Sequence, residues 1–505
     1  MIRCTVQKEI GKMPQAQAYG FIVSEGDLLT QTEPILEWYP HLEDLMRVRS
    51  FTGKKQQVLI VPVTVNDQQK ELIFVGAGKP KDRGIIDIEL YRRAIGTLVR
   101  QAHTVYASVV ALIVPNGTLF GVSQAELIKQ TIITTHMTSF MFDKFLTERD
   151  RSGELIELIL CGEHIGSVHE IDAIIKNAEI IGTAVNKARW WVDMPPTHMT
   201  PPVLAEKAEK IAQKHNLKIT IFGEQEIVDM GMGGIAAVSR GSDVDCRLVI
   251  MEYRVADKNA PTVAFVGKGI TFDSGGLSLK PARSMETMKD DMSGAAAVIA
   301  SMEALAQLKP AINIIGLAPL SENLPSGKAT KPGDIIRFYN GKTAEVKNTD
   351  AEGRLILADA LSYAVKHYKP DAIIDLATLT GACAHALGPF HCGMMSEHDE
   401  LVARVQEASH YSGDRVWRLP LHDDYKTAIK SSLADICNIG NEKIMAGAIT
   451  AAHFLQHFVD DIPWVHLDIA GTAFDVPDIS YLRSGATGFG VRLLIDLAMN
   501  WQKSK

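Results

Sequence analysis

Short apolar runs alternate with helical patterns along most of the chain. In the first part, the runs typical of buried strands are FIV (21–23), QVLIVPVTV (57–65), ELIFVGAG (71–78), ASVVALIVP (107–115) and ELIELILC (154–161). Segment 86–103, IDIELYRRAIGTLVRQAH, repeats its apolar positions every three or four residues, as an amphipathic helix does. We therefore expect residues 1–165 to form a sheet with covering helices.

A long helical pattern and a proline-rich stretch separate this part from the rest. The pattern runs from Val168 to Trp191 and stops at DMPPTHMTPP, which contains four prolines and the helix-start signal Thr200-Pro-Pro. We expect residues 166–200 to be a linker helix and a proline-rich linker.

The remaining residues, 201–505, again alternate between apolar runs and helical segments. The runs are continuously apolar, which suits strands covered on both faces: 217–223, 246–255, 262–269, 312–320, 371–379 and 464–471. This pattern predicts a three-layer α/β/α domain with a mixed central sheet, so the whole chain is of the α/β class. The pair Asn340-Gly341 between β-prone arms predicts a hairpin at 337–346.

Composition and charge limit the classes of function. The 505-residue chain is 46% hydrophobic, so it can bury a large core and should hold more than one domain. Its net charge of -8 gives no overall attraction to nucleic acid or to anionic lipid. The N-terminus lacks the apolar core of a secretory signal, and no apolar run is long enough to cross a bilayer. We expect a cytoplasmic protein that does not contact membranes.

The cysteines are Cys4, Cys161, Cys246, Cys383, Cys392 and Cys437. They lie far apart, and none of them forms a CxxC pair. This spacing argues against a thiolate zinc site and against a disulfide framework, and it favours reduced thiols in packed positions.

The stretch KNTDAEGRLILADAL, residues 347–361, admits two interpretations. Thr349 and Glu352 ahead of an apolar run are typical of a capping box at a helix start. In an extended chain, by contrast, Asp350, Glu352 and Arg354 would point to one side, because residues two apart share a face. The stretch alone does not decide, and a second cluster of matching chemistry would favour a functional role.

Ionisable residues also crowd the end of the apolar run at 262–269. Lys268, Asp273, Lys280, Asp290 and Asp291 lie there, ahead of a helix rich in small residues. In open α/β sheets, ligands bind in the crevice beyond the carboxyl ends of the strands, so this is a candidate site. A solvated loop would use the same residue types. A phosphate-binding loop is disfavoured, because neither GxGxxG nor GxxxxGK[ST] occurs here.

Taken together, the two segments put several carboxylates on strand-exit loops. Ionised carboxylates cannot share a cleft unless cations neutralise them, and oxygen-rich coordination indicates hard or borderline divalent ions. Both segments lack histidine, which disfavours a single-zinc hydrolase of the HExxH type. His453 and His457 stand one helical turn apart without an acidic partner, and we interpret them as packing or surface residues. The residues alone lead to a two-metal hydrolase of unknown class.

A set of motifs makes the sequence resemble a known family, the leucyl aminopeptidases (cytosol aminopeptidases). In chain order the motifs are GKGITFDSGGLSLKP, MKDDMSGAAAV, NTDAEGRL, DLATLTGA, WRLPL, AGAITAAHFL, HLDIAGTA and ATGFGVR. NTDAEGRL is highly specific to that family. The resemblance covers roughly residues 165–500, whereas the first 165 residues match only in general layout.

The resemblance implies a site with two divalent metal ions per subunit, zinc or manganese, with magnesium or cobalt tolerated at one position. The matching metal ligands are Lys268, Asp273, Asp291, Asp350 and Glu352, of which Lys268 would bind through a deprotonated amine. Lys280 matches the group that polarises the scissile carbonyl, and Arg354 matches the residue that positions a bicarbonate as general base. The residues that match the pocket for the first substrate residue are Met288, Asn348, Thr378, Leu379, Gly381 and Ala470.

The implied activity is that of an exopeptidase that releases N-terminal amino acids, leucine-like residues preferred, from peptides. In the mechanism that follows, a metal captures the neutral α-amine and a metal-bridging water attacks the carbonyl, while Lys280 stabilises the oxyanion. Family members form hexamers and have macrodomain-like N-terminal domains, and we expect both here. Some bacterial relatives bind DNA, but the nearly balanced charge of residues 1–165 gives DNA binding no support in this chain.

The chain departs from the family pattern at two places. Asp290 stands where relatives more often have a neutral residue; of two alternatives, that it strengthens metal binding or that its side chain faces solvent, we expect the second. Spacing does not decide between Asp290 and Asp291 as the ligand, so Asp291 is assigned by alignment to the following Met292. The linker VDMPPTHMTPP also differs from the Asn-Pro sequence that is usual in the family. This difference affects the hinge and not the chemistry.

Two other classes of function were weighed. A two-metal phosphoesterase would share the carboxylates, but nothing beyond the metals speaks for phosphate. A noncatalytic regulator or scaffold with a decayed site is disfavoured, because every expected ligand is present.

Overall fold

The chain packs into two compact units. The computed structural model describes residues 2–7, 14–26, 36, 39–65, 67–81, 84–148, 153–165 and 168–501. The N-terminal unit comprises residues 1–186 together with 478–483, and the C-terminal unit comprises 187–477 together with 484–505. Within the part of the chain that is described, no helix is both long enough and apolar enough to span a bilayer.

The N-terminal unit is built on a mixed six-stranded sheet with the order β1-β6-β5-β2-β4-β3. Its strands are β1 (Arg3–Gln7), β2 (Ala18–Ser24), β3 (Val58–Val65), β4 (Gln68–Gly78), β5 (Val109–Ile113) and β6 (Glu157–Cys161). Strands β3 and β4 are antiparallel, and the other neighbours are parallel. The five predicted apolar runs are confirmed as β2 to β6, whereas the short edge strand β1 was not predicted.

The helices of this unit confirm the two helical patterns. In its described residues they are α2 (Leu42–Val48), α3 (Ile88–Thr104), the short 3-10 helix η2 (Gly117–Phe120), α4 (Gln124–Thr138) and most of α5 (Val168–Asp193). Asp87 caps the start of helix α3, because its side chain accepts a hydrogen bond from the Glu89 amide at 2.9 Å. Helix α5 ends at Asp193, directly before the proline-rich stretch, since proline cannot continue a helix.

The C-terminal unit contains a mixed nine-stranded sheet with the order β16-β15-β18-β14-β9-β11-β8-β7, and β10 pairs with β11 outside this path. Its strands are β7 (Lys218–Phe222), β8 (Arg247–Tyr253), β9 (Thr262–Gly267), β10 (Gly269–Asp273), β11 (Asn313–Asn323), β14 (Ala372–Ala377), β15 (Cys392–Met395), β16 (Val416–Arg418) and β18 (Trp464–Asp468). The central strands β10, β11, β9, β14 and β18 are mutually parallel. The predicted runs are confirmed as β7, β8, β9, β11, β14 and β18.

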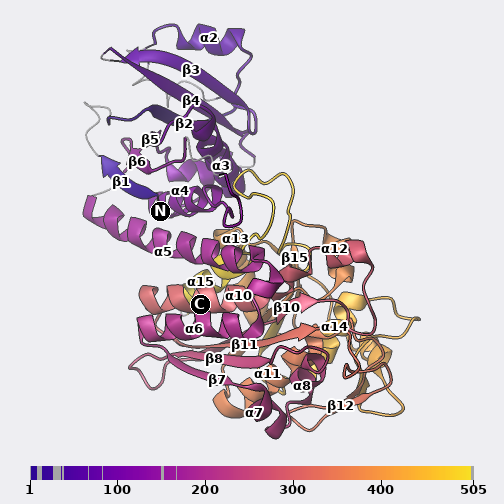
Figure 1. Cartoon of the computed structure of the whole chain (residues 1–505). Helices are drawn as coiled ribbons and strands as arrows, with labels where there is room; N and C mark the ends of the chain where they lie inside the picture. The colour runs from indigo at the N-terminus through magenta and orange to yellow at the C-terminus, as the bar shows by residue number, and fades with distance from the viewer. Residues whose placement is uncertain are drawn as a thin grey trace. The chain divides into compact units, whose positions relative to one another are not determined.

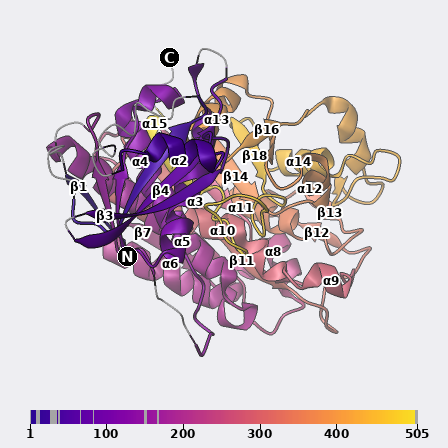
Figure 2. The ribbon, with the colours of Figure 1, turned by 90° about the horizontal axis from the view of Figure 1, so that it is seen from above.

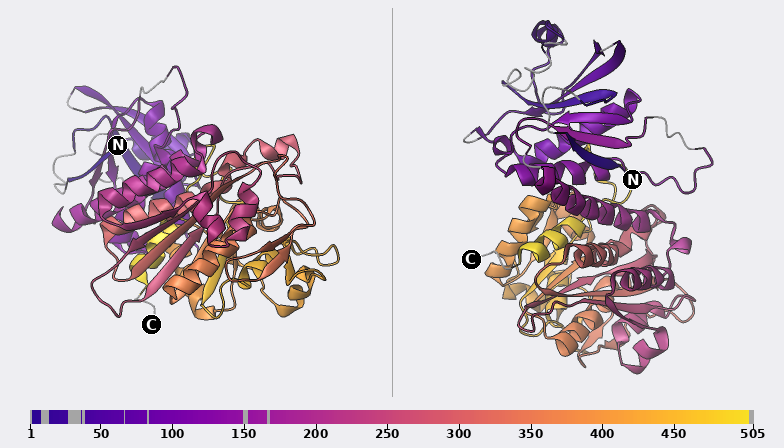
Figure 3. Two further views of the ribbon diagram at one scale, coloured as in Figure 1. Left: turned by 60° about the horizontal axis from the view of Figure 1, so that its bottom comes forward. Right: turned by 90° about the vertical axis from the view of Figure 1, so that its left-hand side faces the viewer.

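Helices cover both faces of this sheet (Figures 1 and 3), which confirms the three-layer arrangement. The layer of α6 (Pro201–His215), α10 (Ser293–Leu308), α13 (Asp399–Ser412) and α15 (Val491–Asn500) packs on one face. The layer of α8 (Gly233–Ser239), α11 (Gly353–Tyr368) and α14 (Gly447–Gln456) packs on the other. Small residues begin α10 because it lies against the backbone of a strand: a Cβ on Gly294 would stand 2.2 Å from the carbonyl oxygen of Leu376.

The other elements of this unit are short. They are α7 (Glu224–Asp229), α9 (Ala282–Met285), α12 (Gly381–Leu387), η3 (Pro196–His198), η4 (Met288–Met292) and η5 (Asp423–Ile429). A separate three-stranded sheet contains β12 (Ile335–Arg337), β13 (Thr343–Glu345) and β17 (Ile436–Cys437). The antiparallel pair β12–β13 confirms the predicted hairpin, with Gly341 at φ +88° in the turn. Figure 2 shows α9, α12, β12 and β13 on the same side of the unit.

Candidate metal centre

The candidate site lies at one edge of the central sheet of the C-terminal unit. Asp273 ends β10, Asn323 ends β11 and Asp468 ends β18, while Lys268 directly follows β9 and Thr378 directly follows β14. Because these strands are parallel to one another, their carboxyl ends meet at the same edge. The topology therefore gathers polar residues that are up to 200 positions apart in the sequence.

Three buried carboxylates form the centre of the site. Asp273, Asp291 and Glu352 each offer an oxygen atom, and these atoms lie within 4.8 Å of one another. We call these residues the carboxylate cluster. Asp291 is carried by η4, which packs against β10, and Glu352 is the residue before helix α11. The structure thus brings together three of the four carboxylates that the resemblance assigned as metal ligands.

Lys268 lies against this cluster and is only 2% exposed. Its Nζ is 2.7 Å from Asp291 Oδ2 and 2.8 Å from Glu352 Oε1, and it donates to the Thr378 carbonyl oxygen at 2.9 Å. Burial disfavours the charge of the ammonium group, but the neighbouring carboxylates outweigh it and hold the pKa of Lys268 well above its usual value. Lys268 can bind a metal only as a neutral amine. Metal ions on the same carboxylates would therefore have to lower the pKa of Lys268.

Lys280 and Asp350 stand beside the cluster. The Nζ atom of Lys280 is 2.8 Å from Asp273 Oδ2 and 2.6 Å from Asp350 Oδ1. Burial again works against the charge of Lys280, yet Asp273 and Asp350 hold the pKa of its ammonium group above the usual value. The charge of Asp350 is less favoured, since burial and then the charge of Asp273 raise the pKa of this carboxyl.

The electrostatics of the carboxylate cluster suit divalent cations. Burial is the largest cause that raises the pKa of both Asp291 and Glu352, and repulsion from neighbouring carboxylates adds to it. Glu352 Oε2 is buried and has no hydrogen-bond partner, whereas Asp291 Oδ2 and Asp350 Oδ1 at least have a lysine ammonium nearby. An all-oxygen donor set with excess negative charge fits hard or borderline divalent ions.

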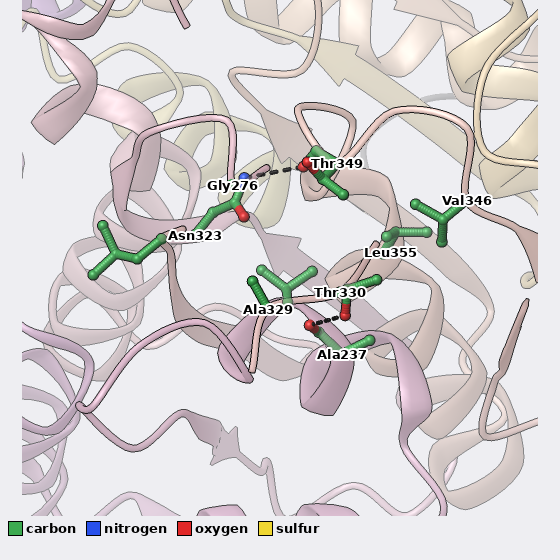
Figure 4. A pocket seen from close by; sticks show the side chains of 10 residues that line it. Ala237, Gly276, Asn323, Ala329, Thr330, Val346, Thr349 and Leu355 are labelled. Carbon is green, nitrogen blue, oxygen red and sulfur yellow. Dashed lines mark hydrogen bonds between the residues drawn. The ribbon is translucent and has the colours of Figure 1, made fainter. Parts of the chain in front are cut away.

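Hydrogen bonds hold Asp273 in place. Its Oδ1 accepts from the Gly275 amide at 2.9 Å and from Asn323 Nδ2 at 2.8 Å. Asn323 Nδ2 also donates to the carbonyl oxygen of Thr349 at 3.0 Å, which ties β11 to the turn before α11 (Figure 4). The adjoining pocket in that view is lined by Asn323, Thr349 and mainly apolar residues, and none of the predicted site residues lines it. This pocket therefore lies beside the residues that hold Asp273 in place and is not itself the predicted site.

The turn at residues 348–352 settles the two interpretations of that stretch. Thr349 Oγ1 donates to the Gly275 carbonyl and accepts from the Ser278 amide, and no side chain caps α11, so the first of the two interpretations, a capping box, does not hold. Asp350 and Glu352 do reach the two lysines, but from a turn rather than a strand. Thr349 thus joins this turn to the loop after β10.

Arg354 lies in the first turn of α11 and is buried. Its Nη1 donates to the carbonyl oxygen of Asn438 at 2.7 Å, and its Nε has no hydrogen-bond partner. Burial lowers the pKa of the guanidinium to about 10, although Glu352 and Asp468 favour its charge. The group is therefore a fixed cation close to the cluster.

The residues predicted for the substrate pocket come from five segments around the site. Met288 is in η4, Asn348 is in the turn before α11, Gly381 begins α12, Thr378 and Leu379 follow β14, and Ala470 follows β18. The Oγ1 of Thr378 donates to Asp291 Oδ1 at 2.7 Å, which links this segment to the cluster.

Asp468 is a residue that the sequence analysis missed. Its Oδ1 accepts from the amides of Leu379, Thr380 and Ala470, and its Oδ2 accepts from Thr380 Oγ1 at 2.6 Å. The carboxylate therefore shapes two predicted pocket segments at once. A signal was present, because Asp468 is an acidic residue inside the apolar run 464–471.

Two further expectations concern single side chains. The prediction that Asp290 faces solvent is wrong: Asp290 is 9% exposed, and burial raises the pKa of its carboxyl to about 7. Adjacent residues of η4 both point inward, since a short 3-10 helix packed on β10 has little exposed surface. His453 is buried and hydrogen-bonded to Gln456 and to the His422 carbonyl, as expected for a packing residue. All six cysteines are free and buried, which confirms the packed thiols.

Comparison with known proteins gives consistent matches over nearly the whole chain. Residues 186–495 match the model of the cytosol aminopeptidase family, catalytic domain, and residues 22–149 match that of the N-terminal domain of the same family. The probable cytosol aminopeptidase of Chlorobaculum tepidum is 43% identical over 459 residues, which cover 86% of this chain and 87% of the relative. The probable cytosol aminopeptidase of Roseiflexus castenholzii is 39% identical over 92% of this chain and 94% of its own length.

Solved structures agree with these sequence matches. A mutant of tomato leucine aminopeptidase superposes with a TM-score of 0.87 at 31% identity, covering 99% of this chain and 97% of the other. The bottromycin maturation enzyme BotP in complex with Mn superposes with a TM-score of 0.84 at 31% identity, covering 96% and 99%. These matches favour a peptidase over the phosphoesterase and scaffold alternatives. The chain belongs to the cytosol aminopeptidase family, the family of the leucyl aminopeptidases, and is a hydrolase of that family.

Proposed function

We propose that this aminopeptidase uses two divalent metal ions, zinc or manganese, to release N-terminal amino acids, leucine-like residues preferred, from peptides. The observation that carries the proposal is the buried carboxylate cluster with Lys268 and Lys280 against it, in a chain of this family. Magnesium or cobalt would be tolerated at one position. The related enzyme BotP, whose structure contains Mn, supports a metal of this kind.

The metal ligands are proposed to be Asp273, Asp291, Glu352, Asp350 and Lys268. Ions held there supply Lewis-acid chemistry, which polarises the scissile carbonyl and lowers the pKa of the attacking water. The Asn323 amide and the Thr378 hydroxyl keep two of the carboxylates oriented. Oriented ligands need little rearrangement when the substrate arrives.

The two remaining cations are proposed to act on the substrate and on a base. Lys280 holds its ammonium at the edge of the cluster, where it can donate to the oxygen of the scissile carbonyl as negative charge develops. Arg354 is fixed by Asn438 and is proposed to position a bicarbonate, the general base that accepts a proton from water. Met288, Asn348, Thr378, Leu379, Gly381 and Ala470 are proposed to line the pocket for the first substrate residue.

The wider organisation is proposed on the same resemblance. We infer that residues 201–505 are the catalytic metallopeptidase domain, 166–200 the linker and 1–165 a macrodomain-like domain. We also infer a cytoplasmic homohexamer that acts on peptides with a free N-terminus. DNA binding by the N-terminal domain has no support in its charge.

Blocking the substrate amine tests the exopeptidase assignment. Leucyl peptides are expected to be cleaved and their N-acetylated forms to be inert, because an acetylated nitrogen has no basic lone pair with which to bind a cation. Release of leucine is measured by chromatography for both substrates at equal concentration. Brisk hydrolysis of the acetylated peptide would contradict recognition of the amine.

Replacing Gly353 by alanine tests the placement of Lys268. An added Cβ would stand 2.4 Å from Lys268 Cε and 2.7 Å from its Nζ, so the side chain has to leave its position between Asp291 and Glu352. We expect Gly353→Ala to lower turnover by roughly a hundredfold, the cost of a displacement of about 1 Å. Alanine is otherwise the better helix former, so α11 should remain intact.

The matched control for this variant is Gly327→Ala. Gly327 lies in a turn where an added Cβ would meet no atom within 4 Å. Circular dichroism and the kinetics of both variants are compared with those of the unmutated chain. Equal activity of Gly353→Ala and Gly327→Ala would show that the position of Lys268 does not matter.

A further inference from the structure

A second group of potential metal ligands lies in the N-terminal unit. Cys4 on β1, His136 on α4 and Glu179 on α5 each offer one ligand atom, and these atoms lie within 4.8 Å of one another. Figure 1 shows β1, α4 and α5 as neighbours in this unit. The group brings together three elements that are distant in the sequence, and neither the proposed function nor the family matches use it.

The histidine of this group is buried without a full set of partners. His136 is 5% exposed, and its Nε2 atom is buried and has no hydrogen-bond partner. Its ring packs against Gly182 of α5, where an added Cβ would stand 2.7 Å from the Cβ of His136 and 3.0 Å from its Cγ. A buried ring nitrogen without a partner is costly, and a metal ion would satisfy it.

The cysteine and the glutamate supply negative charge. Cys4 is a free, buried thiol, and Glu179 is half-buried and accepts a hydrogen bond from the Cys4 amide. A thiolate, a carboxylate and a neutral imidazole together carry two negative charges, which one divalent cation balances. A neutral sum matters here because unbalanced charge is unfavourable at a buried site.

We propose that Cys4, His136 and Glu179 bind one divalent cation of the zinc class. Sulfur, nitrogen and carboxylate oxygen are the ligands that zinc takes in proteins, and a tetrahedral zinc holds them roughly 3.4–3.6 Å apart. Side chains whose ligand atoms lie within 4.8 Å reach that geometry by movements of about 1 Å. The half-buried side of Glu179 leaves room for a water molecule as the fourth ligand.

Binding at this site is a balanced exchange. The S–H bond of Cys4 breaks, its proton leaves to solvent, and a sulfur–metal bond forms without any change of oxidation state. The soft thiolate distinguishes this site from the all-oxygen carboxylate cluster, which suits harder ions. The metal would fasten the edge strand β1 to helices α4 and α5, so its role is structural. Because Cys4, His136 and Glu179 are far apart in the sequence, no CxxC pattern marks the site.

Cobalt titration of the full-length chain tests the proposal. A cobalt ion bound by thiolate has a charge-transfer absorption that oxygen ligands do not produce, and the carboxylate cluster contains no cysteine. We expect this absorption to reach the intensity of one thiolate-bound Co²⁺ per chain and to vanish when Zn²⁺ is added. Complete absence of the band in the unmutated chain would overturn the proposal, and this measurement needs no variant that might fail to fold.

Variants identify the ligands. Cys4→Ser is expected to abolish the band, and His136→Gln to weaken cobalt binding by about a hundredfold, at least the cost of losing a supporting group around a metal. Cys161→Ser is the matched control, because Cys161 is another buried free thiol, on the neighbouring strand β6, outside both groups of potential ligands. Glu352→Gln should keep the band, which separates this site from the proposed catalytic one. A band that survives Cys4→Ser and disappears in Cys161→Ser would also overturn the assignment.

Discussion

Replacing Lys280 by alanine is expected to lower turnover by about a hundredfold or more while leaving the bound metal nearly unchanged. The Nζ of Lys280 lies 2.8 Å from Asp273 Oδ2 and 2.6 Å from Asp350 Oδ1. As a cation it competes with metal ions for these oxygens, so its removal does not weaken metal binding. It does remove the donor that would stabilise the negative oxygen of the transition state, and that loss falls on turnover.

Two measurements separate these effects. Metal content is measured by atomic absorption, and turnover and KM are measured on leucyl anilide, for Lys280→Ala and for the control Lys347→Ala. Lys347 is a half-exposed lysine whose Nζ is 3.9 Å from Glu345 and which contacts no member of the carboxylate cluster in the described structure. A fall in metal content that parallels the fall in turnover would make Lys280 part of the metal site and not a donor to the substrate.

The fold was largely predictable because burial leaves a strong pattern in the sequence. The strands β9, β11, β14 and β18 are covered on both faces, so most of their residues are apolar or small, and the runs stand out. The edge strand β1 has a single buried residue among its five, Cys4, and its sequence RCTVQ carries no such pattern. An edge strand with few buried side chains is therefore hard to predict from hydrophobic pattern, because its pairing with the sheet sets its conformation.

The candidate site was predictable in its chemistry and much less so in its geometry. Carboxylates at strand exits indicated divalent ions, and the structure brings Asp273, Asp291 and Glu352 together. The orientation of Asp290 and the partners of Thr349 depend on contacts with other segments, so the expectation that Asp290 faces solvent was wrong, and the local sequence left the role of Thr349 open. Tertiary contacts outweighed the local capping preference because the Thr349 hydroxyl finds two partners in the loop after β10.

The residues that position the site residues were also not predictable from the sequence. Asp468 binds three backbone amides of the predicted pocket segments, yet in the sequence it is one acidic residue among sixty. Arg354 donates to the backbone carbonyl of Asn438. Every residue type has this carbonyl, so the sequence does not indicate the interaction. Residues that position other residues are visible only when the segments that they join are placed in space.

The acidic side chain with the largest expected effect is that of Glu352. Its Oε1 lies 2.8 Å from Lys268, and its Oε2 is buried without a hydrogen-bond partner. In Glu352→Gln the side chain keeps its shape but loses its negative charge, and an amide nitrogen replaces one ligand oxygen. We expect the variant to lose about one equivalent of metal and to fall in turnover by at least roughly a thousandfold, because positioning and charge stabilisation depend on the same ions.

The control for Glu352→Gln is Glu322→Gln. Glu322 is also buried, on β11, but it accepts a hydrogen bond from Ser242 Oγ at 2.6 Å and lies outside the carboxylate cluster. A glutamine can accept the same hydrogen bond, so this variant should keep its metal and its activity. Dialysis of the unmutated protein against a chelator should reproduce the loss seen in Glu352→Gln, and added Mn²⁺ or Zn²⁺ should restore activity only to the unmutated chain. Metal-free protein that still cleaved leucyl anilide at the normal rate would mean that the buried carboxylates serve the fold and not the reaction, since nothing else in the cluster can activate water in the same way.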